Sequence, residues 1–146
     1  MKNNILMFLI VVSSGTMGSY CYGQTTDTET KVYSDFHIHQ GVLYTSGILG
    51  TDHKENIPAK FEEEVRQLFA NLDKILHRAN IRKEKIYSVT VFLSDIAKID
   101  SFNELYRNYF HAPFPVRTCV GVEGLAKKAR VEMSVLAIYD SQEKSG

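Results

Sequence analysis

The stretch FPVRTCVGV, running from Phe114 to Val122, combines strand-forming residues with an arginine and a cysteine. Side chains alternate between the two faces of a strand, so Arg117 and Cys119 are expected to share one face and the valines that follow to take the other. If the valines face a core, the arginine is costly on its apolar face unless a carboxylate or another anion meets it. A planar guanidinium suits a carboxylate in a bidentate way. The stretch therefore predicts either an anion-binding arginine or an internal pair between Arg117 and a glutamate.

Two amphipathic helices are predicted before this strand, with another strand between them. From Lys60 to Asn80, apolar residues recur every three or four positions, as in a helix that packs one face on a sheet. Ile99 to Phe110 repeats this pattern, and Pro113 and Pro115 end it because a helix cannot continue through them. Ile86 to Leu93 is rich in β-branched and aromatic residues, which favour a strand.

Further strands are predicted on either side of these elements. Val32 to His39 and Val42 to Ser46 contain many strand-forming residues, and Gly41 separates them. The polar and glycine-containing segment from Gly47 to Pro58 is predicted to be a loop. Arg130 to Tyr139 is predicted to be the last strand.

The order of these elements predicts an α+β fold, a mixed sheet with both helices packed on one face. The helix at 60–80 connects two strands, for which a right-handed crossover with parallel pairing is the expected arrangement. The opposite face of the sheet has no predicted element to cover it. Because small domains bury such faces in assemblies, we expect a homo-oligomer.

The N-terminal segment has the residue order of a secretory signal peptide. Lys2 precedes the apolar run Ile5 to Val12, and small or turn-forming residues follow. A membrane-spanning helix needs about 20 apolar residues, so this run is too short to be one. We therefore expect an exported protein, periplasmic or secreted, cleaved near Gly23. Lipid anchoring through Cys21 is the alternative, although the bulky Tyr20 stands where a small residue is needed.

This interpretation divides the chain into a signal peptide at 1–23, a flexible lead-in at 24–31, a single domain at 32–140 and a polar tail at 141–146. Cleavage leaves Cys119 as the one cysteine, so no intrachain disulfide is expected. Lys and Arg number 17 and Asp and Glu also number 17, without the basic stripe that nucleic-acid binding requires. The expected partners are a small molecule and further copies of the chain.

Several segments together resemble one family, the reactive-intermediate deaminases (Rid, YjgF/UK114). The similarity runs in order from about Tyr33 to Tyr139, nearly the whole predicted domain. The segments that carry it are VLYTSG at 42–47, VRQLFANLDKIL at 65–76, IYSVTVFLSDI at 86–96, FNELYRNYF at 102–110, FPVRTCVGV at 114–122 and VEMSVLAIY at 131–139.

The resemblance implies a chorismate-mutase-like protomer that forms a homotrimer with a β-barrel-like core and sites in the clefts between subunits. It also implies hydrolytic deamination of reactive 2-enamine and 2-imino acids, such as 2-iminopropanoate and 2-iminobutanoate, to 2-oxo acids and ammonia. No metal or organic cofactor is expected for this chemistry.

The resemblance also assigns roles to individual positions. Arg117 matches the arginine that holds the substrate carboxylate, and Glu132 matches the glutamate that orients the attacking water. The positions expected to line or order the pocket are Tyr33, Ser46, Gly47, Asn103 and Cys119. The chain departs from the family pattern at Ile48, Gly121 and Ser134, where polar residues are common, and this leaves the substrate open.

Other interpretations of these residues remain open. The leading alternative is a non-catalytic trimer that binds small carboxylates or acts as a chaperone, and a nuclease is disfavoured by the balanced charge. Cys119 as a thiolate nucleophile would need a lowered pKa. His37 and His39 would share a strand face, but two ligands without a third make a weak metal site.

Overall fold

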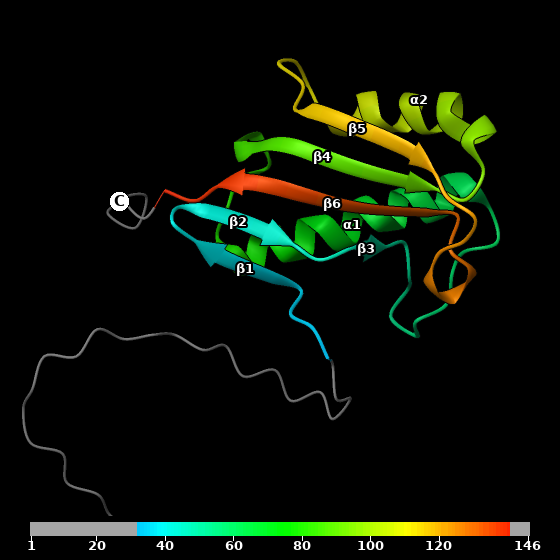
Figure 1. Ribbon diagram of the computed structural model, residues 1–146, viewed down its shortest axis with the longest axis horizontal. Helices are drawn as coiled ribbons and strands as arrows, with labels where there is room; N and C mark the ends of the chain where they lie inside the picture. The colour runs from blue at the N-terminus through cyan, green and yellow to red at the C-terminus, as the bar shows by residue number, and fades with distance from the viewer. Residues whose placement is uncertain (1–31, 141–146) are drawn as a thin grey trace, which may run out of the picture. The chain divides into compact units, whose positions relative to one another are not determined.

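The computed structural model describes residues 32–140 of the chain. Its strands form a single sheet, and its helices lie on one side of that sheet (Figure 1). The predicted signal peptide, lead-in and polar tail lie outside the described residues. Between residues 32 and 140, no helix is both long and apolar enough to cross a membrane.

Most predicted elements are confirmed, with boundaries shifted by a few residues. The elements are β1 (Phe36–His39), β2 (Val42–Thr45), β3 (Ile48–Leu49), α1 (Phe61–Ala79), η1 (Lys83–Lys85), β4 (Ile86–Leu93), η2 (Ile96–Lys98), α2 (Ile99–Tyr109), β5 (Val116–Gly121), η3 (Ala126–Lys128) and β6 (Val131–Ile138). The short β3 was missed, because two residues inside a glycine-flanked segment carry no periodic signal. The first strand also begins later than predicted, since residues 32, 33 and 35 lie in bends and β1 starts at Phe36.

The sheet has the strand order β1-β2-β6-β4-β5, with β3 pairing alongside β6. Only β4 and β5 pair in parallel, and α2 connects them. The other pairs are antiparallel. The expected parallel pairing across the first helix is wrong, because β6 returns from the end of the chain and lies between β2 and β4. The crossover that connects two neighbouring parallel strands is instead the one through α2, from β4 to β5.

Helix α1 follows from its apolar stripe and ends at a left-handed residue. Its first turn is acidic and its last turn contains His77 and Arg78, which suits the helix dipole. Asn80 caps the C-terminus with φ 54°, a conformation that asparagine tolerates better than most residues. The next residue, Ile81, donates its N–H to the carbonyl of Leu76 at 2.9 Å, which closes the helix end.

The core lies between the sheet and the two helices. Along β6, buried and less buried residues alternate, and Val131, Met133, Val135 and Ala137 are the buried set. In β4, Val89, Val91 and Leu93 lie in register with residues of β6 on the same side. Each fully buried aliphatic side chain of this kind contributes about 1.5–3 kcal/mol to stability. The sheet is therefore apolar toward the helices along its central strands.

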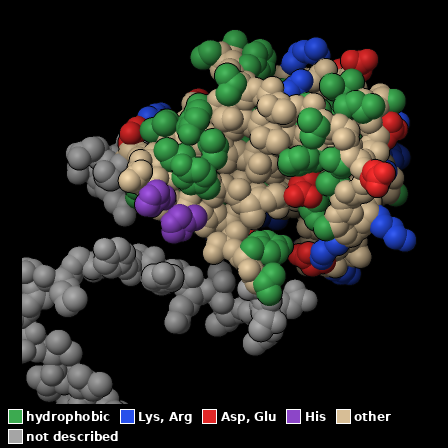
Figure 2. Space-filling view, viewed as in Figure 1, with side chains coloured by type: hydrophobic (Ala, Val, Ile, Leu, Met, Phe, Trp, Pro, Cys, Tyr) green, Lys and Arg blue, Asp and Glu red, His purple; other side chains and the backbone are tan. Residues whose placement is uncertain are grey.

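The opposite face of the sheet carries no element of the described chain. Figure 2 shows this face, with hydrophobic side chains gathered in patches and some of them beside histidines. Val116 is 69% exposed here, and Tyr44, Val120 and Ile138 are also exposed. These residues belong to β2, β5 and β6, so the patches extend across the sheet. The expectation that one sheet face would lack cover is confirmed for residues 32–140.

One charged group is fully buried on the helix side. Glu64 in α1 has no exposed surface, and its Oε2 accepts a hydrogen bond from Arg130 Nε at 2.6 Å. Its Oε1 accepts the backbone N–H groups of Arg130 and Val131 at 2.7 and 3.3 Å. The Arg130 guanidinium also donates to the carbonyls of Pro58 and Ala59. This pair joins the start of α1 to the start of β6.

Candidate functional site

The side chain of Arg117 lies on the helix side of the sheet. Arg117 is in register with Val89 of β4, whose side chain is buried beneath the helices. The predicted alternation along β5 is confirmed, since Cys119 shares the face of Arg117. The valines, however, do not face the core, because β5 is an edge strand and the helix covers only the other side. Val116 and Val120 lie on the uncovered face.

Helix α2 fixes the position of the Arg117 guanidinium. Its Nη2 donates a hydrogen bond to Asn103 Oδ1 at 2.8 Å. Its Cζ lies 4.7 Å from the ring centroid of Tyr106 and 5.8 Å from that of Phe102. A guanidinium carries five N–H donors, and Asn103 is the one acceptor that residues 32–140 provide. The other donors are available for an anion, and no internal Arg–Glu pair forms within the described chain.

Cys119 lies beside this arginine as a half-buried free thiol. It packs against the helix-side core. Burial raises the pKa of the Cys119 thiol, although the Arg117 guanidinium acts in the opposite direction. A raised pKa keeps the thiol protonated near neutral pH, so the geometry gives no support to a thiolate nucleophile.

Glu132 lies on the uncovered face of the sheet. It is in register with Phe92 of β4 and Leu49 of β3, between the buried Val131 and Met133. Its carboxylate contacts Gly47 so closely that a Cβ at that position would lie 1.8 Å from Oε1. No other described side chain forms a hydrogen bond or an ion pair with it within 32–140. The carboxylate is therefore free to hold a water or a substrate group.

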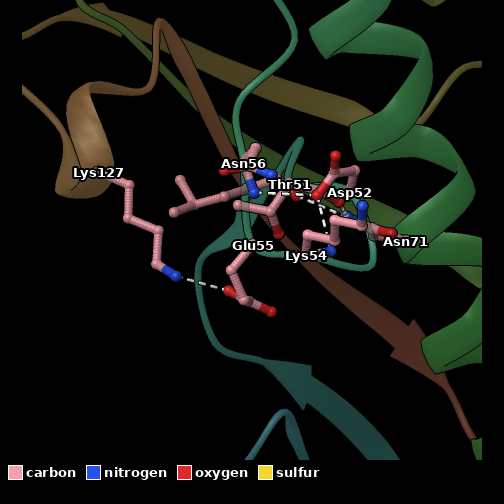
Figure 3. Close-up of polar contacts among 8 residues, drawn as sticks. Thr51, Asp52, Lys54, Glu55, Asn56, Asn71 and Lys127 are labelled. Atoms are coloured by element: carbon pink, nitrogen blue, oxygen red, sulfur yellow. Dashed lines mark hydrogen bonds and ion pairs between the residues drawn. The ribbon is translucent and has the colours of Figure 1, made fainter.

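Asp35 and Asn71 hold the segment that contains Ser46 and Gly47. Ser46 donates both its N–H and its hydroxyl to the carbonyl of Asp35, at 3.0 and 3.3 Å. After Gly47, Asn71 of α1 donates to the carbonyls of Leu49 and Thr51, both at 2.9 Å. Figure 3 shows Asn71 reaching from α1 toward the backbone at Thr51. The backbone that meets Glu132 is thus anchored to α1.

The predicted site residues form two separate groups. The arginine half consists of the predicted Asn103, Arg117 and Cys119 on the helix side of the sheet, and the structure adds Tyr106, whose ring contacts Arg117. The glutamate half consists of Ser46, Gly47 and Glu132, on or beside the uncovered face. Arg117 and Glu132 lie on opposite faces of one sheet, so a single protomer does not bring them together. Tyr33 belongs to neither half, since it is 61% exposed in the bend before β1.

The three departures from the family pattern have different structural settings. Ile48 is buried in the core, opposite Met133, and does not point to the face that carries Glu132. Gly121 lies on the face of Arg117, where an added Cβ would be 3.3 Å from Ile96 Cβ. Ser134 lies opposite Thr90 on the uncovered face.

Sequence reasoning overlooked two features of this arrangement. Tyr106 follows Asn103 by three residues and so lies on the same helix face, a spacing that could have identified it. Glu64 was not singled out, although it interrupts the apolar stripe of α1 between Phe61 and Leu68. A charge at an apolar position was the signal that could have identified it.

The two strand histidines share one face, as predicted. His37 and His39 are exposed on β1, and their ring centroids are 6.3 Å apart. Among residues 32–140, no group of three His, Cys, Asp or Glu side chains is arranged to hold a metal ion. The histidine pair therefore has no third ligand in the described chain.

Comparisons with known proteins place this geometry in a family. The family model described as "Endoribonuclease L-PSP" matches residues 10–139. A RutC family protein of Aquifex aeolicus is 37% identical over 109 residues, covering 73% of this chain and 87% of the relative. A human protein named 2-iminobutanoate/2-iminopropanoate deaminase is 32% identical over 108 residues, covering 73% of this chain and 79% of its own.

Solved structures agree with the sequence matches. The crystal structure of yeast Mmf1 superposes with a TM-score of 0.72 at 30% identity, covering 77% of this chain and 90% of the yeast chain. The α+β fold, a mixed sheet with two helices, is thus that of a known structural group. The family-model match to residues 10–139 includes both halves of the site. The chain belongs to the endoribonuclease L-PSP family, the Rid (YjgF/UK114) family that its sequence motifs indicate.

Proposed function

We propose that this protein hydrolyses reactive 2-enamine and 2-imino acids, of the 2-iminopropanoate and 2-iminobutanoate type, to 2-oxo acids and ammonia. The arginine half carries this proposal. A guanidinium on an aromatic ring, with one donor held by Asn103 and others free, suits the carboxylate that every such substrate carries. The human relative named as a deaminase of these imines supports the same substrate class.

The active assembly in this proposal is a homotrimer with sites between subunits. Two observations support it: the uncovered sheet face exposes apolar residues, and Arg117 and Glu132 lie on opposite faces of one protomer. Cyclic symmetry repeats one contact between unlike surfaces, so each interface can join one protomer's arginine half to its neighbour's glutamate half. The sites then number one per subunit and are incomplete in the isolated chain.

In the proposed mechanism, Arg117 binds the substrate carboxylate and fixes the imine carbon in place. That carbon is already electrophilic, so orientation of a water contributes more than a strong nucleophile would. Glu132 accepts a proton from this water as its oxygen bonds to the carbon. The proton then passes to the nitrogen, giving a carbinolamine with a hydroxyl and an amino group on the former imine carbon. The hydroxyl proton moves through Glu132 to the amino nitrogen as the carbon–nitrogen bond breaks, so that ammonia and a 2-oxo acid leave. No redox change and no further reactant are required.

Release of 2-oxo acid from enzymatically generated 2-iminopropanoate and 2-iminobutanoate tests this proposal. The protein is expected to accelerate release over spontaneous hydrolysis, and Arg117→Ala is expected to lose about 100-fold or more of that acceleration. Arg107→Ala removes an exposed arginine of α2, the helix that packs beside Arg117, and serves as the charge-matched control. Equal rates for the wild type and the blank would refute the deaminase proposal.

A non-catalytic carboxylate-binding protein is the second candidate. The observation that favours it is that the arginine half is assembled within one chain, without any contribution from Glu132. Such a protein would be stabilised by 2-oxobutanoate in a thermal shift experiment and would leave imine hydrolysis at the rate of the blank. Arg117→Ala would remove the stabilisation.

We also propose that the protein is exported after cleavage near Gly23. The support is the order of Lys2, the apolar run at 5–12 and the small residues after it. Intact-mass measurement of the protein recovered from cell fractions tests this. A mature chain that begins near Gln24 outside the cytoplasm is expected, and a full-length cytoplasmic chain would contradict it.

A further inference from the structure

Tyr106 of α2 is buried beside Arg117 with its hydroxyl unused. The residue is 5% exposed, and its Oη has no hydrogen-bond partner within the part of the chain that the structure describes. A buried hydroxyl without a partner costs about 1–3 kcal/mol of stability. Phenylalanine would fill the same space without that cost. The part of this side chain that contacts Arg117 is its ring.

The ring is held rigidly by other aromatic side chains. Its centroid lies 4.5 Å from that of Phe110, 5.7 Å from Phe102 and 6.5 Å from Phe114. These contacts fix one face toward the sheet edge, where the Arg117 Cζ lies 4.7 Å from the centroid. Phe102 is further from the guanidinium, at 5.8 Å. Tyr106 is thus the main aromatic support of the arginine.

The contact is between a cation and a neutral ring. Burial raises the pKa of Tyr106 to about 12, against a lowering effect of Arg117, so the phenol stays protonated at neutral pH. The negative face of an aromatic ring attracts a guanidinium at this distance, and the attraction grows where water is excluded. Asn103 holds the same guanidinium from its edge through one N–H.

We propose that Tyr106 is a positioning residue for carboxylate recognition. Its ring fixes the plane of the Arg117 guanidinium and Asn103 fixes its rotation, so the remaining N–H donors are presented as a pair to the incoming carboxylate. This inference rests on the proposed function for the identity of the substrate. The carboxylate contact itself does not require turnover, and it can be tested separately.

The experiment measures the Kd of 2-oxobutanoate by calorimetry together with kcat and KM for imine hydrolysis. Tyr106→Leu is expected to weaken binding and raise KM by about 3- to 30-fold, the range of a cation–π contact, with kcat nearly unchanged. Tyr106→Phe is expected to restore binding to the wild-type value and to raise the melting temperature. Tyr109→Leu removes a nearby aromatic ring that does not contact Arg117 and is the matched control.

A trifluorinated phenylalanine at position 106 covers the case in which Tyr106→Leu fails to fold. It keeps the shape of phenylalanine but weakens the negative ring face, so it should bind 2-oxobutanoate more weakly than Tyr106→Phe does. Equal binding by these two variants, or an unchanged Kd in folded Tyr106→Leu, would overturn the assignment. So would a wild-type protein that binds no carboxylate. Binding that depends on Tyr106 without any turnover would uphold it and would refute only the deaminase proposal.

Discussion

The arginine half and the glutamate half of the candidate site are built in different ways. In the arginine half, residues 102–119 supply one helix and the strand that follows it, and the guanidinium has a hydrogen bond and an aromatic support. In the glutamate half, the loop at 46–47 lies against Glu132, which is far from it in the sequence. The Glu132 carboxylate contacts Gly47 but forms no hydrogen bond with a described side chain. The first half is ordered by the protomer's own core, and the second lies on a face that the protomer leaves uncovered.

Because of this difference, binding of the substrate carboxylate and hydrolysis of the substrate depend on different parts of the molecule. Carboxylate binding depends on contacts that one chain makes by itself, whereas hydrolysis under the proposed mechanism needs Arg117 and Glu132 at one substrate. Because the two residues lie on opposite faces, the proposed mechanism requires an assembly of subunits for catalysis. Variants that act on one half alone can therefore test the division.

The largest expected effect comes from mixing two inactive variants. Arg117→Ala and Glu132→Ala should each abolish most activity, but trimers reassembled from an equal mixture should regain about one quarter of the wild-type sites. This fraction follows because an intact site needs Arg117 from one subunit and Glu132 from a particular neighbour, each present with even odds. Imine hydrolysis after joint refolding is the measurement.

Each variant refolded alone, at the same total concentration, is the control for this experiment. No recovery in a mixture shown by native mass spectrometry to contain mixed trimers would place both residues in one protomer's site. That outcome would contradict the opposite-face arrangement described above.

Loss of the buried Glu64–Arg130 ion pair should lower the stability of the fold and thereby reduce the activity that depends on the glutamate half. Arg130→Ala leaves the fully buried Glu64 carboxylate without its charge partner, and such a loss costs about 3–5 kcal/mol. Urea unfolding should show this drop. Because Arg130 immediately precedes β6, the strand that carries Glu132, hydrolysis should fall at temperatures where the variant is still folded, while 2-oxobutanoate binding by the arginine half is retained. Lys127→Ala, at an exposed ion pair with Glu55, is the control and should change stability by less than about 1 kcal/mol.

A smaller but more local effect is expected at Gly47. Gly47→Ala would place a carbon 1.8 Å from Glu132 Oε1, so the flexible carboxylate must move away. Displacement of a catalytic group by about 1 Å can reduce the rate about 100-fold. We expect a loss of that order in kcat, with the Kd of 2-oxobutanoate and the melting temperature nearly unchanged.

Gly124→Ala is the matched control for this glycine. An added Cβ there meets no atom within 4 Å, so activity and stability should both be retained. If Gly47→Ala keeps full activity, Glu132 does not orient the water from the position that the structure gives it.

The fold and the site differ in how far sequence allowed them to be predicted. Long elements with a clear pattern were predicted well: β4 has the predicted bounds, and α1 differs from the prediction by one residue at each end. The position of β6 between β2 and β4 was not predicted, since its pairing depends on long-range contacts that no local pattern encodes. The two-residue β3 was missed for the same reason.

Individual site residues were easier to name than to place. Arg117 and Cys119 were predicted to share a strand face because alternation along a strand is a local property. Which sheet face the helices cover is a property of the whole sheet, so the sequence alone did not say which face the valines of this stretch take. In the structure they lie on the uncovered face. The supporting role of Tyr106 depends on the packing of four aromatic rings, and an apolar stripe alone does not show which ring meets the arginine.

The smallest expected effect concerns Cys119, the remaining member of the arginine half. Burial raises the pKa of its thiol and Arg117 lowers it by less, so the protonated form dominates near neutral pH. Cys119→Ala should therefore change kcat by less than about threefold, whereas loss of a true nucleophile costs orders of magnitude. Imine hydrolysis by the variant is the measurement, and a loss comparable to that of Arg117→Ala would restore the thiolate interpretation.

The pH dependence of Cys119 alkylation distinguishes a protonated thiol from an inaccessible one. With a raised pKa, reaction with iodoacetamide should be slow near pH 7 and should accelerate only as the pH rises above the usual range of a thiol. Arg117→Ala removes the one contribution that lowers this pKa, so its alkylation profile should shift to still higher pH. Because the folded-state pKa is raised, the neutral thiol stabilises the fold below the unfolded-state pKa, and that stabilisation disappears as the pH rises through the folded-state value. An unchanged profile in Arg117→Ala would mean that the guanidinium does not act on the thiol, and Cys119 would then no longer belong to the arginine half.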